Sequence, residues 1–513
     1  MEKIQKNDEL ELVIEDITTE GEGVGKINGL ALFVKDAIIG DKVKVKVMKM
    51  KKNYGYARLI EIIEPSFART EPVCPVARQC GGCQLQHMKY EEQLKYKENK
   101  VKNCLERIGG ISFQKEETSQ KEENFERVEK DFEKEDKTFE SIEESLKKED
   151  KVFDRVEGRV RKENNNFKKA VFEPIIGMEE PFYYRNKAQF PVGKNKDGKI
   201  VMGFYAGRTH SIIDTSHCYI QAKENEQLLQ IVREFMEKNQ IEPYNEETHT
   251  GLVRHVLTRV GFTTGEIMVC LIVNGEKLPN AEKLVDKLKD IKGMTSICLN
   301  VNKEKTNVIL GNKVKVLWGQ GYITDYIGDI KYQISPLSFY QVNPVQTKKL
   351  YETALEYAGL TGNEVVWDLY CGIGTISLFL AKNAKKVYGV EIVPQAIEDA
   401  KKNAEINDIE NAEFFVGAAE EILPQKYKES NGQIKAQVIV VDPPRKGCDE
   451  KLLETIVKME PEKIVYVSCD PATLARDLKY LEGQGYKVEK VKACDMFGHS
   501  VHVETVVLLS GKK

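Results

Sequence analysis

The sequence predicts an α/β protein whose C-terminal part is a doubly wound, Rossmann-like sheet, preceded by a small N-terminal β-barrel and a central α/β domain. Three observations lead to this fold class. Short β-rich runs and turns fill the first 66 residues, apolar runs alternate with helical patterns from residue 328 onward, and 513 residues exceed what one core usually holds. We therefore expect three domains, at residues 1–66, 67–327 and 328–513.

The N-terminal segment, from about Glu9 to Ser66, reads as a barrel of about five short strands. Its run DKVKVKVMK places Val43, Val45 and Val47 on one face and three lysines on the other. Residues 42–110 hold fifteen Lys or Arg and seven Asp or Glu, although the whole chain has a net charge of −4. Small barrels with a basic exterior commonly bind RNA. The segment also resembles the TRAM domain of many RNA-modifying enzymes, so we favour RNA binding over a merely solvated face.

The composition also bears on location. No apolar stretch reaches the roughly 20 residues that cross a membrane, and the first ten residues lack a signal-peptide core. Eleven unevenly spaced cysteines suit a reducing compartment better than a disulfide framework. We therefore expect a cytoplasmic protein with no membrane partner, in which a cluster of cysteines indicates a metal.

Such a cluster follows the barrel. Three cysteines have the spacing C-x5-C-x2-C in a glycine-rich segment, namely Cys74, Cys80 and Cys83. Cys218 is the candidate fourth ligand, with His217 and His87 as rivals. Four thiolates could hold either a structural zinc or an iron–sulfur cluster, and the spacing alone leaves both open.

Residues 113–170 form a charged insertion in which a 14-residue unit recurs, starting at Phe125, Phe139 and Phe153. Its half-filled apolar seam predicts a marginal amphipathic helix or a disordered segment, and we expect a tolerated insertion without catalytic residues. Beyond it, basic and aromatic residues interleave on alternating strands in a way that suits RNA contacts. These residues are Arg185, Lys187, Tyr205 and Arg208.

The C-terminal domain contains seven apolar runs, beginning near residues 365, 386, 412, 436, 463, 486 and 501, which predict a seven-stranded sheet. In DLYCGIGT, Gly372 and Gly374 let the backbone approach a ligand, and Glu391, about twenty residues later, can bind ribose hydroxyls. The acid at the end of the second strand, without a G-x-G-x-x-G motif, favours S-adenosylmethionine over NAD.

Two further strands end in reactive residues. Cys469 follows the run KIVYVS, and Asp442 follows VIVV. Open parallel sheets bind ligands beyond the carboxyl ends of their strands, so this thiol is expected to face a substrate rather than serve as a buried hydrophobe.

Five motifs in order, SFYQVN, DLYCGIGT, DPPRKG, SCDPATLARD and HVETVVLL, resemble the 5-methyluridine RNA methyltransferase family. The resemblance implies a class I methyltransferase sheet that ends in an antiparallel pair. It also implies that Cys469 adds to C6 of a uracil and that Glu504 then removes the C5 proton. An acid within the apolar run VHVETVVLL is costly unless it has such a task.

The same resemblance assigns the methyl-donor site to Gln341, Tyr370, Glu391 and Asp442. It also allows Phe339 to stack on a uracil that has been flipped out of a helix. Where some relatives have Asn or Asp, this chain has Ala418 and Ala419, and Glu420 is a possible substitute in adenine recognition. Iron–sulfur members of the family have the same cysteine spacing with a distant fourth cysteine, which implies a 4Fe–4S cluster on Cys74, Cys80, Cys83 and Cys218.

We therefore expect an S-adenosylmethionine-dependent RNA (uracil-5-)-methyltransferase. The barrel and metal site resemble the 23S rRNA enzymes more than the tRNA enzyme, which remains the alternative. We expect a monomer that does not act on DNA. A degenerate RNA-binding scaffold is disfavoured by the intact Cys469, Glu504 and Asp442. Cytosine-5 methylation is disfavoured because its motifs place the cysteine after a proline, whereas this chain reads Ser-Cys-Asp-Pro.

Overall fold

The computed structural model describes residues 4–114, 169–207, 209–215, 217–431 and 434–511 of the chain. It divides into two compact units, residues 1–110 with 173–513, and residues 111–172. In the second unit, the described ends meet in a parallel bridge between Phe113 and Ala170. The 14-residue repeats lie outside the described residues, so their expected structure stays a prediction. In the part of the chain that is described, no helix is long and apolar enough to span a membrane.

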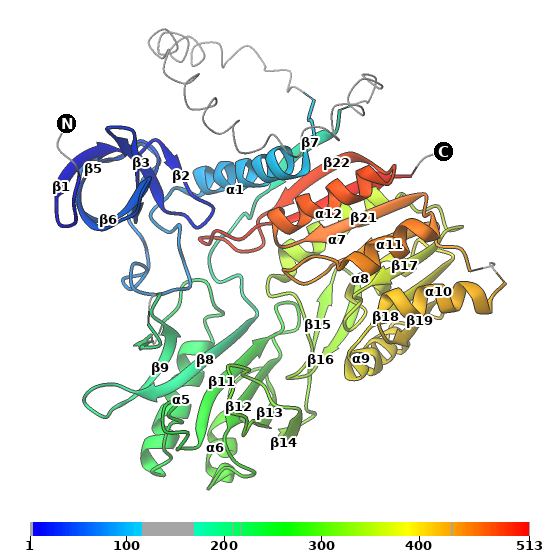
Figure 1. Ribbon diagram of the computed structural model, residues 1–513. Coiled ribbons are helices and arrows are strands. Elements are labelled where there is room, and N and C mark those ends of the chain that lie inside the picture. Colours follow the sequence, from blue (N-terminus) through cyan, green and yellow to red (C-terminus); the bar gives the residue numbers. More distant parts are fainter. Residues whose placement is uncertain (1–3, 115–168, 208, 216, 432–433, 512–513) are drawn as a thin grey trace. The chain divides into compact units, whose positions relative to one another are not determined.

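The N-terminal segment forms a six-stranded sheet that curls into a barrel-like form (Figure 1). The strand order is β1-β5-β6-β4-β3-β2. The strands are β1 (Glu9–Val13), β2 (Asp16–Ile17), β3 (Gly23–Ile27), β4 (Leu30–Lys35), β5 (Lys42–Met50) and β6 (Tyr54–Glu64). The expected five strands are therefore six, because the two-residue β2 pairs with β3 at the edge of the sheet.

The alternation predicted in β5 is confirmed, since its three valines at positions 43, 45 and 47 are fully buried. The lysines between them are partly exposed but do not form an unpaired basic stripe. Lys42 lies 3.2 Å from the Glu64 carboxylate and Lys44 lies 3.2 Å from that of Glu9. Neighbouring strands therefore partly neutralise the face that the sequence favoured for RNA binding.

The central segment contains a seven-stranded sheet of order β10-β9-β8-β11-β12-β13-β14. Its elements are β8 (Lys187–Lys194), β9 (Ile200–Tyr205), β10 (Ile212–Asp214), α5 (Asn225–Lys238), β11 (Val253–Val260), β12 (Ile267–Val273), α6 (Ala281–Leu288), β13 (Met294–Val301) and β14 (Lys313–Gly319). Helices α5 and α6 share one apolar core with inward residues of these strands, such as Phe190 and Val256. The opposite face carries a smaller core with Leu257, Cys270 and Cys298. The α/β scaffold expected here is thus present.

The C-terminal sheet has eight strands in the order β19-β18-β17-β20-β21-β23-β22-β7. They are β7 (Val171–Ile176), β17 (Val365–Leu369), β18 (Lys386–Glu391), β19 (Ala412–Val416), β20 (Val438–Val441), β21 (Lys463–Ser468), β22 (Lys487–Cys494) and β23 (Glu504–Ser510). The seven predicted strands are all present, and β22 and β23 form the expected antiparallel pair. The eighth, β7, was not predicted and lies at the edge beside β22.

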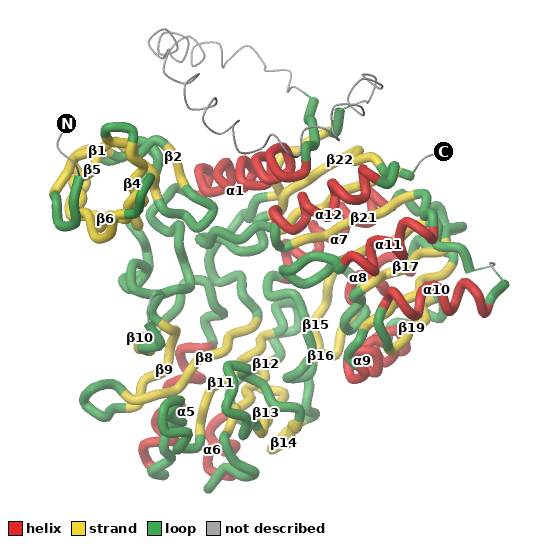
Figure 2. Tube along the Cα trace, viewed as in Figure 1, coloured by secondary structure: helices red, strands yellow, loops and turns green. Residues whose placement is uncertain are grey.

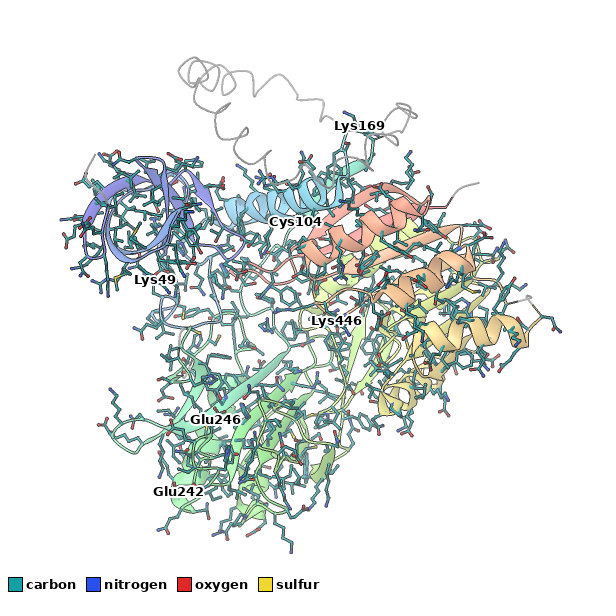
Figure 3. All side chains as sticks on the ribbon, viewed as in Figure 1. Lys49, Cys104, Lys169, Glu242, Glu246 and Lys446 are labelled. Atoms are coloured by element: carbon teal, nitrogen blue, oxygen red, sulfur yellow. The ribbon has the colours of Figure 1, made fainter. Side chains whose placement is uncertain are left out.

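Helices cover both faces of this sheet, as a doubly wound fold requires (Figure 2). The first three are α7 (Pro344–Ala358), α8 (Thr375–Ala381) and α9 (Pro394–Glu405), and the last three are α10 (Ala419–Glu429), α11 (Glu450–Met459) and α12 (Pro471–Gly483). The hairpin of β15 (Ile323–Ile327) and β16 (Ile330–Ile334) packs against α7, α8 and α9. Helix α1 (Tyr90–Cys104), which continues as the π-helical turn Leu105–Gly109, packs against α12. Figure 3 labels Cys104 at the end of α1.

Candidate active site

Three neighbouring parallel strands end at the carboxyl edge of the C-terminal sheet, β17 and β20 level with each other and β21 slightly farther along, at Ser468. In the parallel register, Val441 of β20 lies beside Leu369 of β17 and beside Tyr466 of β21. Tyr370 and Asp442 are the next residues past this level. The sheet therefore delivers both to the edge at which such folds bind their ligands.

Cys469 lies just past the end of β21, between a strand and a capped helix. Ser468, the last residue of β21, pairs with Thr505 of the antiparallel β23, next to Glu504. On the other side, the Asp470 carboxylate accepts two backbone N–H groups in the first turn of α12, each at 3.0 Å. Strand pairing and the helix cap thus fix the backbone on both sides of Cys469 and bring it beside Glu504.

The ionisable side chains at this edge interact electrostatically. Burial, and then the charges of Glu504 and Asp442, raise the pKa of the Cys469 thiol to about 11, against an opposing effect of Arg445. Burial and Asp442 raise the pKa of Glu504 to about 8, and burial and Asp368 raise that of Asp442 to about 7. Carboxyl groups whose pKa values are raised toward neutral pH, beside a thiol with a perturbed pKa, are typical of sites that transfer protons.

Glu504 is more deeply buried than Cys469 and Asp442. Only 4% of its surface is exposed, and no hydrogen bond or ion pair to its carboxylate is found among the described residues. A buried acid without such partners avoids the cost of an isolated charge by staying protonated. Burial therefore favours the protonated form of Glu504 at neutral pH, and loss of that proton would make it a base.

The turn after β17 is shaped for a ligand. Tyr370, Gly372 and Gly374 have φ values of 73°, 54° and 81°, in the left-handed region where side chains are strained. A Cβ added to Gly372 would meet no atom within 4 Å, so its backbone borders open space. The Glu391 carboxylate at the end of β18 accepts the Gly372 N–H at 3.3 Å and the Val393 N–H at 3.0 Å. The carboxylate and the turn thus form one local structure.

Two other predicted residues lie on the segment that leads into α7. Gln341 is buried, with 7% of its surface exposed, whereas Phe339 is 66% exposed. Asn186 fixes this segment, because its side chain donates to the Gln341 carbonyl at 2.9 Å and its N–H donates to the Val342 carbonyl at 2.8 Å. The ring of Phe339 is therefore free to meet an incoming group.

Ala418 stands where some relatives have an Asn or Asp that recognises adenine, and the chain just before it lies close to the same turn. The Gly417 N–H donates to the Glu391 carbonyl at 3.0 Å, which places the chain before Ala418 next to β18. Burial, followed by nearby charges that include Glu420, raises the pKa of the Tyr370 hydroxyl. The proposal that Glu420 replaces the adenine-binding residue stays a prediction.

The structure brings the four predicted cysteine ligands into one neighbourhood. Cys83 and Cys218 pack against the same small apolar cluster around Tyr184. Burial, and then the charge of Cys218 followed by those of Cys80 and Cys74, raise the pKa of Cys83 to about 12. His217 points elsewhere, to Glu226 at 2.9 Å and to the Tyr183 hydroxyl at 2.9 Å. All eleven cysteines of the chain are unpaired.

Within the described ranges, no group of three or more His, Cys, Asp or Glu side chains could hold a metal ion. Polar contacts to sulfur are nevertheless present. The Gly82 N–H donates to Cys80 Sγ at 3.4 Å, and backbone hydrogen bonds from Ile220 and Gln221 oppose the effect of burial on the pKa of Cys218.

Sequence reasoning missed one residue that acts electrostatically on the candidate site, although it lies within a quoted motif. Arg445 follows the two prolines of DPPRKG, and its charge lowers the pKa of both Cys469 and Glu504 against the effect of burial. Its guanidinium also lies 3.4 Å from His502 Nε2. Figure 3 labels the next residue, Lys446, on the same loop. The sequence did contain a signal for Arg445, namely the basic pair Arg445–Lys446 shortly after Asp442 in this motif.

The basic and aromatic residues that were predicted to interleave for RNA contacts lie in different parts of the central segment. Arg185 and Lys187 lie at the start of β8, beside Asn186. Tyr205 instead donates its hydroxyl to Glu246 at 3.1 Å, and Arg208 lies outside the described residues.

Comparison with known proteins agrees with this geometry. The family model described as tRNA (Uracil-5-)-methyltransferase matches residues 148–512, and the TRAM domain model matches residues 3–60. An uncharacterized RNA methyltransferase of Clostridium tetani is 47% identical over 508 residues, which cover 99% of this chain and 97% of the relative. One of Halalkalibacterium halodurans is 48% identical over 510 residues, covering 99% and 98%.

A solved structure is similar along the same length. The tRNA (uracil-54, C5)-methyltransferase of Pyrococcus abyssi, in complex with S-adenosyl-L-homocysteine, superimposes with a TM-score of 0.70 at 27% identity. The match covers 97% of this chain and 99% of that chain. Because the family model spans more than half of the sequence and the relatives align over nearly all of it, this chain belongs to the tRNA (uracil-5-)-methyltransferase family of RNA methyltransferases and carries a TRAM domain at its N-terminus.

Proposed function

We propose that this protein transfers a methyl group from S-adenosylmethionine to C5 of uridine in 23S rRNA. The observation that carries the proposal is the convergence of Cys469, Glu504 and Asp442 at the carboxyl edge of a methyltransferase sheet. A thiol nucleophile and a carboxylate base are the two groups that methylation of C5 requires, because this carbon is too weak a nucleophile to attack a methyl donor directly.

In the proposed reaction, a bond forms between Cys469 Sγ and C6 of the uracil. The electron pair of the C5–C6 double bond moves toward C5 and the C4 carbonyl, so that C5 becomes nucleophilic. S-adenosylmethionine supplies the methyl group that C5 takes up. Glu504 then accepts the C5 proton, the C5–C6 double bond re-forms, and the bond to Sγ breaks.

The electrostatics support these roles. A thiol with a pKa near 11 is mostly protonated at neutral pH, and burial is the main cause. Ionised Glu504 and Asp442 raise this pKa further, whereas Arg445 lowers it. The thiolate of Cys469 therefore forms more readily while Glu504 is neutral, which is the form that burial favours.

The turn after β17 fits the methyl donor. The open backbone at Gly372 and the acid Glu391 at the end of β18 are the features that nucleotide sites of this fold use. We propose that Gln341, Tyr370 and Asp442 complete the donor site. Phe339, with its exposed ring, would stack on the flipped uracil.

We further propose that the four cysteines hold a 4Fe–4S cluster. The proposal is supported by the C-x5-C-x2-C spacing with a distant fourth cysteine, which resembles that of the iron–sulfur members of the family. The thiols of Cys83 and Cys218 interact electrostatically, as neighbouring ligands of one cluster would. N–H groups aimed at Cys80 and Cys218 suit sulfurs of a cluster. The unpaired state of all eleven cysteines agrees with the cytoplasmic location we propose.

Transfer RNA is the second candidate substrate, because the similar Pyrococcus abyssi enzyme methylates it. The decisive experiment incubates the purified protein with methyl-labelled S-adenosylmethionine and transcripts of 23S rRNA domains or of tRNA, followed by nucleoside analysis. We expect labelled 5-methyluridine in a 23S fragment. Label in tRNA alone would identify tRNA, and not 23S rRNA, as the substrate. Label in 5-methylcytidine would show that the enzyme methylates cytosine instead of uracil. RNA binding without any label would favour an RNA-binding scaffold.

A further inference from the structure

Two cations face each other across neighbouring strands of the central sheet. In the antiparallel register of β8 and β11, Lys187 lies directly opposite Arg259. Like charges in this position destabilise a sheet. Ala188 lies in the core shared with α5 and α6, so the alternation of β8 places Lys187 on the opposite face of the sheet.

A third cation joins them without an acidic partner. Arg185 lies two residues before Lys187, and its guanidinium lies 5.9 Å from the ring of Phe497. The Nε atoms of Arg185 and Arg259 are buried and have no hydrogen-bond partner. We call Arg185, Lys187 and Arg259 the β8–β11 cations. In the ranges that the structure describes, no carboxylate forms an ion pair with any of them.

Their mutual repulsion affects the charge of the lysine. Burial, and then the charges of Arg259 and Arg185, lower the pKa of Lys187 to about 7. An anion bound beside these groups would raise that pKa again and remove the repulsion. The arrangement is thus costly by itself and becomes favourable with a bound anion, which is typical of a binding site and not of a structural cluster.

The β8–β11 cations border the proposed active site. Arg259 donates a short hydrogen bond to the Ser338 carbonyl, one residue before Phe339. Asn186, between the other two cations, holds the backbone of Gln341. Arg259 is only 2% exposed, so its positive charge would act on a ligand electrostatically and without direct contact. Arg185 and Lys187 are half-buried and can contact a ligand directly.

We propose that the β8–β11 cations bind a backbone phosphate adjacent to the uridine that the enzyme methylates. The inference rests on the proposed RNA methylation. A nucleotide that leaves its stack must be held by its backbone while the base lies in the site, and phosphate contacts supply that hold. Phe339 on the same segment is exposed for the base, so base and phosphate would be gripped from neighbouring positions.

The test compares Lys187→Met with Lys194→Met. Lys194 ends the same strand but is paired with Glu242 at 2.5 Å, so its variant removes an equal charge from a site that has an acid. Affinity for a labelled 23S rRNA fragment is measured by fluorescence anisotropy as a function of salt. Lys187→Met should lower the slope of log K against log salt by about 0.7 to 0.9, and Lys194→Met should leave it unchanged.

Two further readouts separate a binding role from a structural one. Lys187→Met should raise the melting temperature at pH 6, because it removes a half-buried cation that has no acidic partner. It should also raise KM for RNA far more than it changes kcat. Replacing one phosphate beside the methylated uridine with a neutral methylphosphonate should weaken wild-type binding and leave Lys187→Met unaffected. Equal salt slopes for wild type and Lys187→Met, or a lowered melting temperature, would overturn the proposal.

The outcomes also distinguish this site from its neighbours. A loss of S-adenosylmethionine affinity in Lys187→Met, with an unchanged salt slope, would assign the cations to the donor carboxylate and overturn the phosphate site. In another outcome, the wild type forms no 5-methyluridine while Lys187→Met still lowers the salt slope of RNA binding. That outcome would refute the proposed reaction and support the phosphate site. Formation of 5-methyluridine with equal salt slopes would refute the phosphate site alone.

Discussion

Replacing Glu504 with Gln should stabilise the folded protein at alkaline pH. The unfolded chain ionises this residue near a pKa of about 4.3, whereas the folded chain does so near 8, because of burial and Asp442. Between these values the folded state binds more protons than the unfolded state, so the free energy of unfolding falls as pH rises. A shift of this size corresponds to an upper limit of about 5 kcal/mol, and relaxation with water entry should reduce it to roughly 2 kcal/mol.

The assay is urea unfolding at pH 5 and pH 8.5, followed by tryptophan fluorescence. The chain has two tryptophans, and Trp318→Phe leaves Trp367, which is fully buried in β17, as the reporter of the catalytic sheet. Glu504→Gln should match the wild type at pH 5 and exceed it at pH 8.5.

Glu173→Gln is the control for this assay. Against the raising effect of burial, hydrogen bonds from Lys492 and Lys490 lower the pKa of Glu173. Its stabilising contribution is therefore present above the unfolded pKa and is lost as pH falls through the folded value. Because pH 5 and pH 8.5 both lie above the unfolded pKa of about 4.3, this variant should be less stable than the wild type at both pH values. A Glu504→Gln protein that is destabilised equally at both pH values would refute the assignment of a buried, neutral Glu504.

The remaining predictions concern catalysis and the cysteine site. Cys469→Ala should lower methyl transfer about 10⁴-fold or more and leave S-adenosylmethionine affinity unchanged by calorimetry; undiminished turnover would exclude a covalent route. Glu504→Gln should accumulate a protein–RNA adduct that survives denaturing gels, and loss of activity without adduct would place Glu504 in an earlier step. In the wild type, the rate should fall below about pH 8, where Glu504 becomes protonated, while a flat profile from pH 6 to 9 would argue against Glu504 as the base. Anaerobically purified protein should be brown, and Cys218→Ser, unlike Cys104→Ser, should lose the colour and bind RNA more weakly; colourless wild type with one zinc per chain would contradict the cluster.

The catalytic sheet could be predicted closely because its signals are local. Each strand from β17 to β23 coincides with an apolar run, and each helix between them has its own periodicity. The edge strand β7 was missed for the opposite reason. It lies some two hundred residues before the rest of its sheet, directly after the charged insertion, and no local pattern states which sheet an isolated strand will join.

The residues of the candidate site were predictable where a strand end fixes them. Cys469 and Asp442 follow apolar runs, and the fold alone brings the carboxyl ends of such strands together. Cross-strand neighbours were not predictable. The pairing of Lys44 with Glu9, and the placement of Lys187 opposite Arg259, depend on registers between distant segments. For this reason, the sequence overestimated how many lysines of β5 are free to bind RNA. It also gave no indication that the β8–β11 cations lie together.

The loop between β22 and β23 shows how the cysteine segment and the catalytic edge are joined. Lys97 of α1 and Asp495 of this loop are both fully buried, with Nζ 2.6 Å from the carboxylate. Desolvation makes such a pair a poor source of stability, so its effect is to specify one conformation. Just past Cys83, the N–H groups of residues 84 and 85 both donate to the carbonyl of His499 in the same loop. Because the loop leads directly into β23, whose first residue is Glu504, these hydrogen bonds join the segment of the proposed cluster ligands to the strand of the proposed base. We propose that a cluster bound there, although it has no redox task in methylation, fixes the segment on which this loop rests.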